Sequence, residues 1–120
     1  MKDFVLVVED DASIRQSLCD ILTEEGYPAV GAENGQEALD CMRAGRRPYL
    51  ILLDLMMPVM DGATFRRQQL RDPSLRSIPV AIITAAGRQA AAGIPADVFL
   101  AKPLRVESLL AVVERFRSVA

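Results

Sequence analysis

Four short apolar runs each end in residues suited to metal or phosphoryl chemistry. The runs cover residues 4–8, 50–53, 80–83 and 98–101. The residues that follow them are, in order, Glu9 with Asp10, Asp54, Thr84 and Lys102. If the runs are parallel strands of one sheet, their carboxyl ends meet at one edge. Carboxylates, a hydroxyl and an ammonium gathered there suit a divalent cation and a phosphoryl group.

The three carboxylates predict a Mg²⁺ site. Clustered carboxylates repel one another and are costly to bury without a cation, and Mg²⁺ prefers oxygen ligands. We expect Asp10 and Asp54 to ligate directly, Glu9 to ligate through water, and the Met56 carbonyl to add a neutral oxygen. Taken singly, Asp54 could instead cap a turn, and Asp11 is placed to cap a following helix.

The remaining groups suit a phosphoryl oxygen. Lys102 supplies a positive charge with three donors, and Thr84 supplies a hydroxyl. Ala85 is small, which leaves room for the backbone to approach a phosphate. An aspartate held beside Mg²⁺ and Lys102 can attack phosphorus and become an aspartyl phosphate. The alternative for Lys102 is a solvated surface lysine, although Lys2 is the only other lysine in the chain.

Composition limits the other classes of function. The 120 residues form one expected domain spanning residues 1–120, and the net charge of −2 gives no support for direct binding of nucleic acid. The chain has no histidine, and Cys19 and Cys41 lack metal-ligand spacing, so a Cys/His zinc site is excluded. With no secretory signal and no long apolar segment, we expect a cytoplasmic protein without membrane contact.

The elements that must position these residues alternate between strand and helix. Strands are expected at residues 4–8, 29–32, 49–55, 78–84 and 98–101, and helices at 13–25, between the cap Asn34 and Gly45, at 63–71 and from 105. Glu37 completes a capping box with Asn34, and Gly26 ends the first helix. Such alternation predicts a parallel sheet covered by helices on both faces.

Two helices show a clear apolar stripe at helical spacing. The stripe of the first is Ile14, Leu18, Ile21 and Leu22, and that of the last is Val106, Leu109, Leu110, Val113 and Phe116. We expect these side chains to face the sheet.

With these residues in place, the chain resembles the receiver domain of a two-component response regulator. The matching motifs are residues 5–11 (VLVVEDD), 53–58 (LDLMMP), 60–62 (MDG), 78–80 (IPV), Thr84-Ala85 and Lys102-Pro103. Each motif alone is weak, but the ordered set spans essentially the whole chain and is specific.

The resemblance implies a (βα)₅, flavodoxin-like, doubly wound parallel five-stranded sheet with strand order 2-1-3-4-5. It implies that Asp54 accepts a phosphoryl group from a kinase phosphohistidine, beside a Mg²⁺ site of Asp10 and Glu9. Lys102 then pairs with the phosphate. The partners implied are a sensor histidine kinase or phosphotransfer protein, and an unknown output protein or effector domain.

The resemblance also implies a conformational switch and an unusual peptide bond. Thr84 becomes the switch hydroxyl, and Phe99 the aromatic residue that rotates inward when Thr84 moves toward the phosphate. The bond between Lys102 and Pro103 is cis in the family, as an X–Pro bond can be at modest cost. Such a domain is not an enzyme with a separate substrate, since it catalyses only its own phosphorylation and dephosphorylation.

The chain departs from the family between Thr84 and Lys102. The separation is 18 positions (102 − 84), about four fewer than the family pattern, and residues 87–95 contain two glycines and one proline. We expect a shortened or irregular fourth helix. In the family, the fourth helix and the fifth strand form much of the output and dimer face, so the shortening speaks against standard dimerisation there. The alternative is a harmless shortening of a surface loop.

Other functions remain as alternatives. A pseudo-receiver would act as a docking module without phosphorylation, and the short segment 87–95 is the argument for it. A phosphatase of the haloacid-dehalogenase type needs a second aspartate where Met56 stands, and no nucleotide-binding glycine motif follows the first strand. The chain ends with the last helix, so we expect no attached effector domain. It is a stand-alone regulator, a phosphorelay intermediate or a receiver cut from a larger protein.

Overall fold

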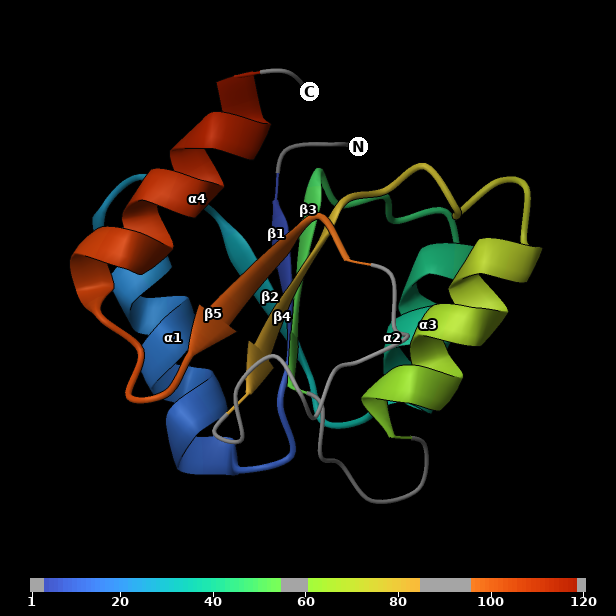
Figure 1. Cartoon of the computed structure of the whole chain (residues 1–120), viewed down its shortest axis with the longest axis horizontal. Helices are drawn as coiled ribbons and strands as arrows, with labels where there is room; N and C mark the ends of the chain where they lie inside the picture. Colours follow the sequence, from blue (N-terminus) through green and yellow to red (C-terminus); the bar gives the residue numbers. More distant parts are fainter. Residues whose placement is uncertain (1–3, 55–60, 85–95, 119–120) are drawn as a thin grey trace.

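The computed structural model describes residues 4–54, 61–84 and 96–118, in which five strands alternate with four helices (Figure 1). The strands are β1 Val5–Val8, β2 Ala29–Ala32, β3 Leu50–Asp54, β4 Val80–Thr84 and β5 Val98–Ala101. The helices are α1 Ala12–Glu24, α2 Gly35–Arg43, α3 Gly62–Arg71 and α4 Val106–Ser118. The predicted irregular fourth helix falls in residues 87–95, outside these ranges.

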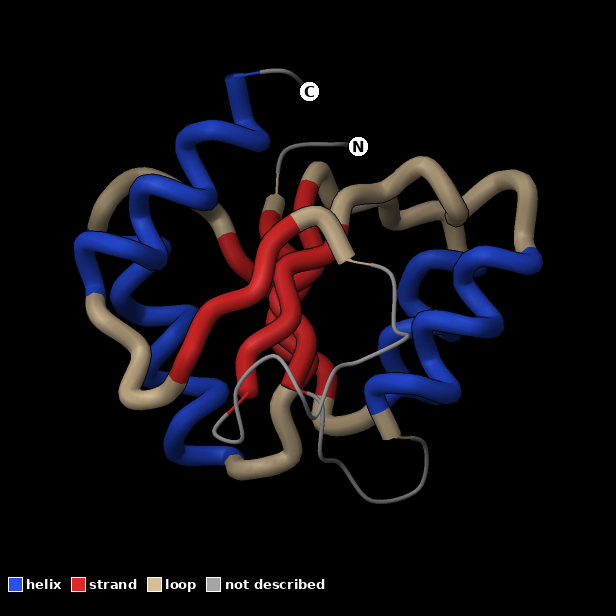
Figure 2. Tube along the Cα trace, in the orientation of Figure 1, coloured by secondary structure: helices blue, strands red, loops and turns tan. Residues whose placement is uncertain are grey.

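All strand pairs are parallel, and the sheet has the order β2-β1-β3-β4-β5. Helices α1 and α4 cover one face, and α2 and α3 cover the other (Figure 2). The predicted doubly wound sheet with order 2-1-3-4-5 is therefore confirmed. This order reverses direction between β1 and β3, which is where such folds place their functional groups.

Successive residues of the central strands point to opposite, equally buried faces. Val5, Val7 and Leu52 pack toward α1 and α4, whereas Leu6 and Leu53 pack toward α2 and α3. Burial on both faces explains why these strands read as continuous apolar runs. Among the described residues, Ile14 and Val106 are the large hydrophobic side chains left exposed.

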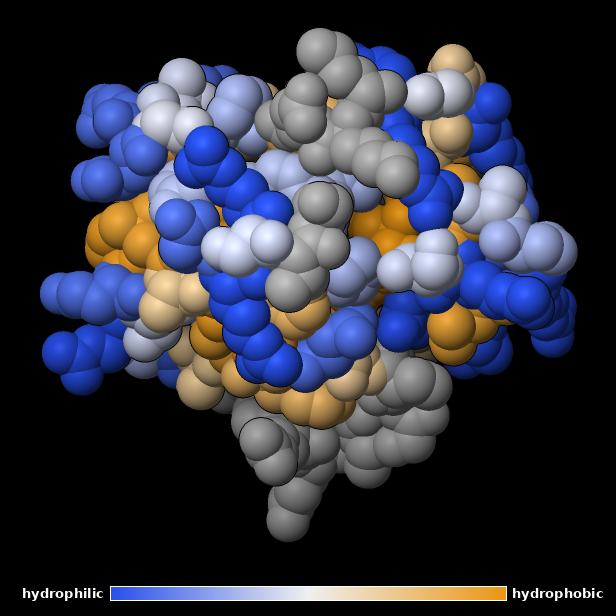
Figure 3. All heavy atoms as spheres, turned by 90° about the horizontal axis from the view of Figure 1, so that it is seen from above, coloured by the Kyte–Doolittle hydropathy of each residue, from blue (hydrophilic) through white to orange (hydrophobic). Residues whose placement is uncertain are grey.

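Ile14 and Val106 correct the predicted stripes. The exposed fraction is 43% for Ile14 and 44% for Val106, although both were expected to face the sheet. Both residues lie in the first turn of their helices, about one turn before the buried residues Leu18 and Leu109. Seen from above, the molecule is mainly hydrophilic, with apolar side chains in separate small areas (Figure 3).

The residues that were predicted to cap the first two helices, Asp11 and Asn34, do cap α1 and α2. Asp11 accepts a hydrogen bond from the N–H of Ile14 at 3.0 Å, and Asn34 accepts one from the N–H of Glu37 at 2.9 Å. The Glu37 carboxylate reaches back to the N–H of Glu33 at 3.3 Å, one residue before the expected partner. Asp61 caps α3 through the N–H of Thr64, which the sequence reading did not anticipate.

Two glycines end their helices in the left-handed conformation. Gly26 has φ 88° and Gly45 has φ 97°, values that other residues rarely adopt. Most element bounds differ from those expected by one or two residues, as helix and strand ends commonly do. Strand β4 starts at Val80 rather than residue 78, because the preceding carbonyl of Ile78 turns to accept a side-chain bond.

That side-chain bond belongs to a buried polar group at the amino ends of β4 and β5. Gln69 is fully buried, and its amide nitrogen donates to the carbonyls of Leu75 and Ile78, each at 3.0 Å. Its amide oxygen accepts from Arg66 at 2.8 Å, and the second guanidinium nitrogen of Arg66 lies 3.9 Å from Asp97. We call Arg66, Gln69 and Asp97 the amino-edge cluster.

The amino-edge cluster ties α3 to the sheet. The carboxylate of Asp97 also accepts from the N–H of Val80 at 2.8 Å, so one group joins the starts of β4 and β5. Burial lowers the pKa of Arg66, and Asp97 opposes that shift. All three polar groups of the Gln69 amide are matched, which is the condition for burying an amide at little cost.

Candidate functional site

The polar strand-end residues meet at the carboxyl edge of the sheet. Asp54 is the last residue of β3 and Thr84 the last of β4, while Glu9 follows β1 and Lys102 follows β5. Asp54 pairs in register with Ile83, the residue before Thr84, so both lie at the end of the same ladder. The parallel topology therefore brings together residues that are far apart in the chain.

Three carboxylates form the centre of this edge. Oxygen atoms of Glu9, Asp10 and Asp54 all lie within 4.8 Å of one another. Glu9 and Asp54 are buried, with exposed fractions of 4% and 7%, whereas Asp10 faces solvent from the turn before α1. We call these three residues the carboxyl-edge cluster. Like charges this close raise the free energy of the folded state unless a cation or a proton joins them.

The effect of this crowding appears at Glu9. Burial raises the pKa of Glu9 to about 7, and the neighbouring Asp10 and Asp54 add to the shift. The N–H of Asp11, which donates to the Glu9 carboxylate at 3.2 Å, acts in the opposite direction. Glu9 therefore carries a proton for part of the time at neutral pH when no cation is bound.

Lys102 supplies the positive charge on the other side of Asp54. Its ammonium nitrogen lies 3.7 Å from a carboxylate oxygen of Asp54, which is an ion pair rather than a direct hydrogen bond. About a third of the Lys102 side chain is exposed, so the ammonium also faces the opening of the site. The peptide bond from Lys102 to Pro103 is cis.

Thr84 and Phe99 lie on the two strands next to Asp54. Thr84 is buried, and its carbonyl accepts from the N–H of Lys102 at 3.1 Å. Phe99 is partly buried against the core on the α2 and α3 side and pairs in register with Ile82. Since Thr84 follows Ile82 by two residues, Thr84 and Phe99 point to the same face.

Several sequence predictions cannot be placed. Met56 and Ala85 lie outside the described residues, as does the segment 87–95. Among the residues that are described, the structure thus brings together Glu9, Asp10, Asp54, Thr84 and Lys102 at one edge, with Phe99 two residues from the end of the neighbouring ladder.

A small apolar pocket, which the sequence reading missed, opens beside the acidic residues. Its volume is about 190 Å³, and its lining residues are Glu9, Ile14, Leu18, Ile83, Lys102, Pro103 and Leu104. The exposed side chain of Ile14 lies here, so its unexpected exposure is part of a hollow that borders the site. The signal available in the sequence was an apolar residue in the first helical turn, immediately after an acidic cap.

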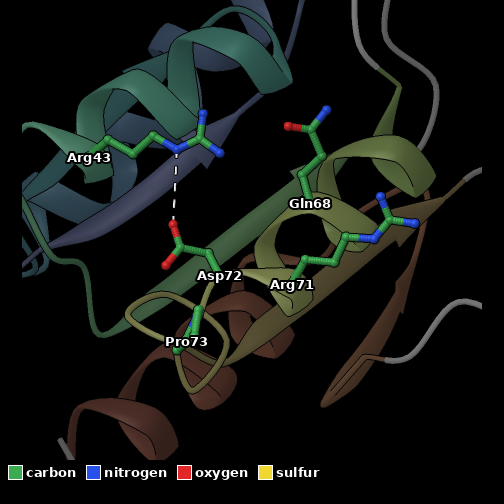
Figure 4. Close-up of a pocket in the computed structure, with 5 residues that line it drawn as sticks. All are labelled: Arg43, Gln68, Arg71, Asp72 and Pro73. Carbon is green, nitrogen blue, oxygen red and sulfur yellow. Dashed lines mark ion pairs between the residues drawn. The ribbon is translucent and has the colours of Figure 1, made fainter.

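A second concavity lies between the carboxyl ends of α2 and α3, away from this edge (Figure 4). Its volume is about 450 Å³, and it is lined by Arg43, Gln68, Arg71, Asp72 and Pro73. Arg43 faces Asp72 across it at 4.0 Å. Basic side chains in the last turn of a helix offset the negative end of the helix dipole, which is a sufficient reason for these arginines.

Comparison with known proteins agrees with the geometry. The family model of the response regulator receiver domain matches residues 5–114. The response regulator MprA of Mycolicibacterium vanbaalenii is 40% identical over 111 residues, or 89% of this chain and 47% of that protein. The MprA protein of Mycobacterium avium is 41% identical with the same coverage. The chain thus spans about half the length of these curated relatives.

Solved structures show the same similarity. The signal receiver domain of a signal transduction histidine kinase from Syntrophus aciditrophicus has a TM-score of 0.89 and 34% identity, covering 98% of this chain and 92% of that one. The chemotaxis protein CheY4 of Vibrio cholerae has a TM-score of 0.83 and 30% identity, covering 97% and 99%. No described helix of this chain is long and apolar enough to cross a membrane. The chain belongs to the response regulator receiver domain family, the signalling modules of two-component systems.

Proposed function

We propose that this domain, spanning residues 1–120, accepts a phosphoryl group on Asp54 and uses it to switch its protein contacts. The observation that carries the proposal is the position of Asp54, which is buried between two carboxylates and the Lys102 ammonium. A carboxylate in that position has a nucleophilic oxygen and, beside it, a cation for the oxygens of the incoming group.

The donor set fits Mg²⁺. Asp10 and Asp54 offer hard oxygen ligands close together. In this proposal Glu9 acts through water and the Met56 carbonyl adds a neutral ligand. Three carboxylates within 4.8 Å of one another, one of them partly protonated, form a site whose charge a divalent cation neutralises. When bound, Mg²⁺ supplies positive charge to the equatorial oxygens of the phosphoryl group.

The residues of the chain then have distinct roles. A carboxylate oxygen of Asp54 attacks the phosphorus of a phosphohistidine, and the bond from phosphorus to the imidazole nitrogen breaks. The electron pair leaves with the imidazole, and Asp54 becomes an aspartyl phosphate. The Lys102 ammonium, now 3.7 Å from Asp54, moves its pairing to a phosphoryl oxygen. Water later attacks the phosphorus of the aspartyl phosphate, the bond from phosphorus to the Asp54 oxygen breaks, and inorganic phosphate leaves with the carboxylate restored. The domain thus catalyses only its own phosphorylation and dephosphorylation.

The switch follows from the new charge. An aspartyl phosphate places about two negative charges and several acceptor oxygens at the end of β3, beside Thr84 on β4. A hydroxyl that turns toward a phosphoryl oxygen vacates space on the face that it shares with Phe99. We propose that Phe99 moves into that space, so that phosphorylation favours a second, already accessible arrangement.

The partners of the domain follow from its surface. A sensor histidine kinase or phosphotransfer protein has to bring an imidazole to Asp54, and the pocket with exposed Ile14 borders that approach. The output is a separate protein or an effector domain, since the curated relatives are about twice as long as this chain. We place this signalling in the cytoplasm, where such kinases have their phosphohistidine.

The docking-module alternative has no support among the described residues. Its one argument, the short segment 87–95, lies outside them, while the residues needed for phosphorylation are brought together. A phosphorylation experiment distinguishes the docking module from the phospho-accepting domain.

Intact mass after incubation with Mg²⁺ and acetyl phosphate tests the proposal. We expect the wild type to gain one phosphate, and Asp54→Ala to gain none. Asp40→Ala is the matched control, because it removes an exposed carboxylate of α2 away from this edge and is expected to be phosphorylated like the wild type. A folded wild type that gains no phosphate from this donor or from a histidine kinase would support the docking module instead.

A further inference from the structure

The backbone of Glu9 is held from two sides. Its N–H donates to the carbonyl of Ala32 at 3.0 Å, which continues the pairing of β1 with β2. Its carbonyl accepts a hydrogen bond from a guanidinium nitrogen of Arg15 at 2.8 Å. The carbonyl belongs to the peptide that joins Glu9 to Asp10, so Arg15 holds the start of the turn that presents Asp10.

Arg15 reaches this carbonyl because residue 31 has no side chain. Arg15 lies in the first part of α1, and its aliphatic stem passes directly over Gly31 of β2. A Cβ atom at residue 31 would lie 2.9 Å from both Cγ and Cδ of Arg15, closer than such atoms approach. Gly31 pairs in register with Val7, whose side chain packs on the α1 side of the sheet.

Gly31 provides space for the Arg15 stem rather than a backbone conformation that only glycine adopts. Gly26 and Gly45 have positive φ angles, whereas the backbone of Gly31 lies outside that range. Alanine at residue 31 is therefore compatible with the strand itself. The three atoms nearest to its methyl group would all belong to the Arg15 side chain, at 2.9 to 3.4 Å.

We propose that Arg15, seated on Gly31, is a positioning residue of the Mg²⁺ site. The inference rests on the proposed function and names a residue that serves it without touching the metal. The turn of Glu9 and Asp10 has to hold two carboxylates close to Asp54 against their mutual repulsion. A charge-assisted bond to the Glu9 carbonyl restrains this turn, and the stem packed on β2 limits the movement of the guanidinium.

Two kinds of substitution separate this role from simple packing. Arg15→Met keeps most of the stem but removes the donor, and Arg15→Lys keeps a donor. Gly31→Ala leaves Arg15 in the chain but displaces its stem. A double-mutant cycle tests whether Gly31→Ala acts through Arg15. If it does, Gly31→Ala has no further effect in a protein that already carries Arg15→Ala. Arg76→Met, an exposed arginine far from this edge, is the control for lost charge.

Calorimetric titration with Mg²⁺ is the first measurement, with circular dichroism to confirm that each variant is folded. We expect Arg15→Met and Gly31→Ala to raise the Kd for Mg²⁺ about five- to tenfold, the effect of one hydrogen bond of ordinary strength. Arg15→Lys should recover part of the loss, and Arg76→Met should bind like the wild type. Arg15→Ala and the double variant Arg15→Ala/Gly31→Ala should have the same Kd.

Phosphorylation by acetyl phosphate across a Mg²⁺ series is the second measurement. A positioning role raises the Mg²⁺ concentration needed for half-maximal rate and leaves the maximal rate unchanged. If Arg15→Met and Gly31→Ala both bind Mg²⁺ like the wild type while Asp54→Asn loses binding, the role of Arg15 is overturned and the proposed function stands. A folded wild type that does not bind Mg²⁺ overturns the proposed function together with the inference.

Discussion

The sheet has a partly buried polar cluster at the amino ends of its strands and another at their carboxyl ends, and the two are assembled in opposite ways. At the amino edge, Arg66 and Asp97 have opposite charges, and every polar group of the Gln69 amide has a partner. At the carboxyl edge, three groups of like charge lie within 4.8 Å of one another. The amino-edge cluster is complete within the chain, whereas the carboxyl-edge cluster has an excess of negative charge that a cation or a proton would offset.

This difference separates the groups that maintain the fold from those that carry the chemistry. A complete polar network restricts the chain to one arrangement, and removal of one member leaves buried groups without partners. A cluster of repelling carboxylates lowers the stability of the folded protein when no cation is bound, which is the expected cost of the proposed Mg²⁺ site. Substitutions at the two edges should therefore change stability with opposite signs.

The largest expected effect is the loss of Gln69. Gln69→Ala removes the side-chain donor to the carbonyls of Leu75 and Ile78 and the acceptor for one Arg66 hydrogen bond, and it opens a cavity. We expect the free energy of unfolding to fall by about 3 kcal/mol. Urea denaturation measures the change. Gln68→Ala is the control, since Gln68 precedes Gln69 on α3 but is only partly buried, and a similar loss there would contradict the comparison.

Removal of the Arg66 guanidinium should lower the free energy of unfolding by less than the loss of Gln69 does. Arg66→Met keeps an unbranched apolar chain in the buried position, leaves the Gln69 oxygen without its donor, and lets the half-exposed Asp97 carboxylate bind water. We expect a loss of about 2 kcal/mol. The same denaturation experiment should give a change within about 0.5 kcal/mol for Arg67→Met, an exposed neighbour on α3. Equal losses would show that helix propensity, rather than the cluster, is responsible.

At the carboxyl edge, substitution of Glu9 is expected to raise the free energy of unfolding rather than lower it. Its pKa is raised from 4.5 to about 7, so the folded protein binds this proton more tightly than the unfolded chain. The contribution of Glu9 to stability is therefore present below about pH 4.5 and is lost as the pH rises through 7. Without Mg²⁺, we expect Glu9→Gln to raise the free energy of unfolding by about 1–2 kcal/mol at pH 8.

Melting temperatures between pH 4.5 and 8 provide the check for Glu9. The wild type should lose stability across this window, and Glu9→Gln should lose less. Asp61 does not obscure the test, because hydrogen bonds from Thr64 lower its pKa and move its titration to more acidic pH. A variant that is less stable than the wild type at pH 8 without Mg²⁺ would show that Glu9 supports the fold rather than the site.

The smallest stability effect is expected at Lys102. Its side chain is about one-third exposed and its pair with Asp54 is 3.7 Å long, so water screens much of the attraction. Lys102→Met should change the free energy of unfolding by no more than about 0.5 kcal/mol. The rate of phosphorylation by acetyl phosphate should nevertheless fall by at least about tenfold, because the charge that stabilises the transferring group is gone. An unchanged rate would remove Lys102 from the mechanism.

Much of this fold could be predicted from the chain because the signals were local. Alternating apolar runs predicted the parallel sheet, and Asn34, Gly26 and Gly45 predicted where helices begin and end. The strand-end carboxylates could be placed together because parallel topology leaves them no other edge. Ordered motifs then predicted the family, which the comparisons confirmed.

The amino-edge cluster and the seat of Arg15 could not be predicted in this way. Gln69 reads as an ordinary surface residue of a helix, and only the path of the loop before β4 brings two carbonyls to it. Gly31 carries no turn signal, since its role depends on which residue of α1 crosses it. Ile14 fits a helical stripe, yet its side chain is exposed and lines the small pocket beside Glu9. These features depend on tertiary contacts that periodicity does not encode.

The placement of the two clusters at opposite edges has an evolutionary consequence. A substitution that removes Asp54 or Lys102 leaves the amino-edge cluster and both apolar layers untouched. Selection for a stable chain would not remove such a variant, because it is expected to be about as stable as its parent. A gene duplicate could thus lose the phosphoacceptor in one step, persist as a folded scaffold, and acquire a new binding role on the same surface.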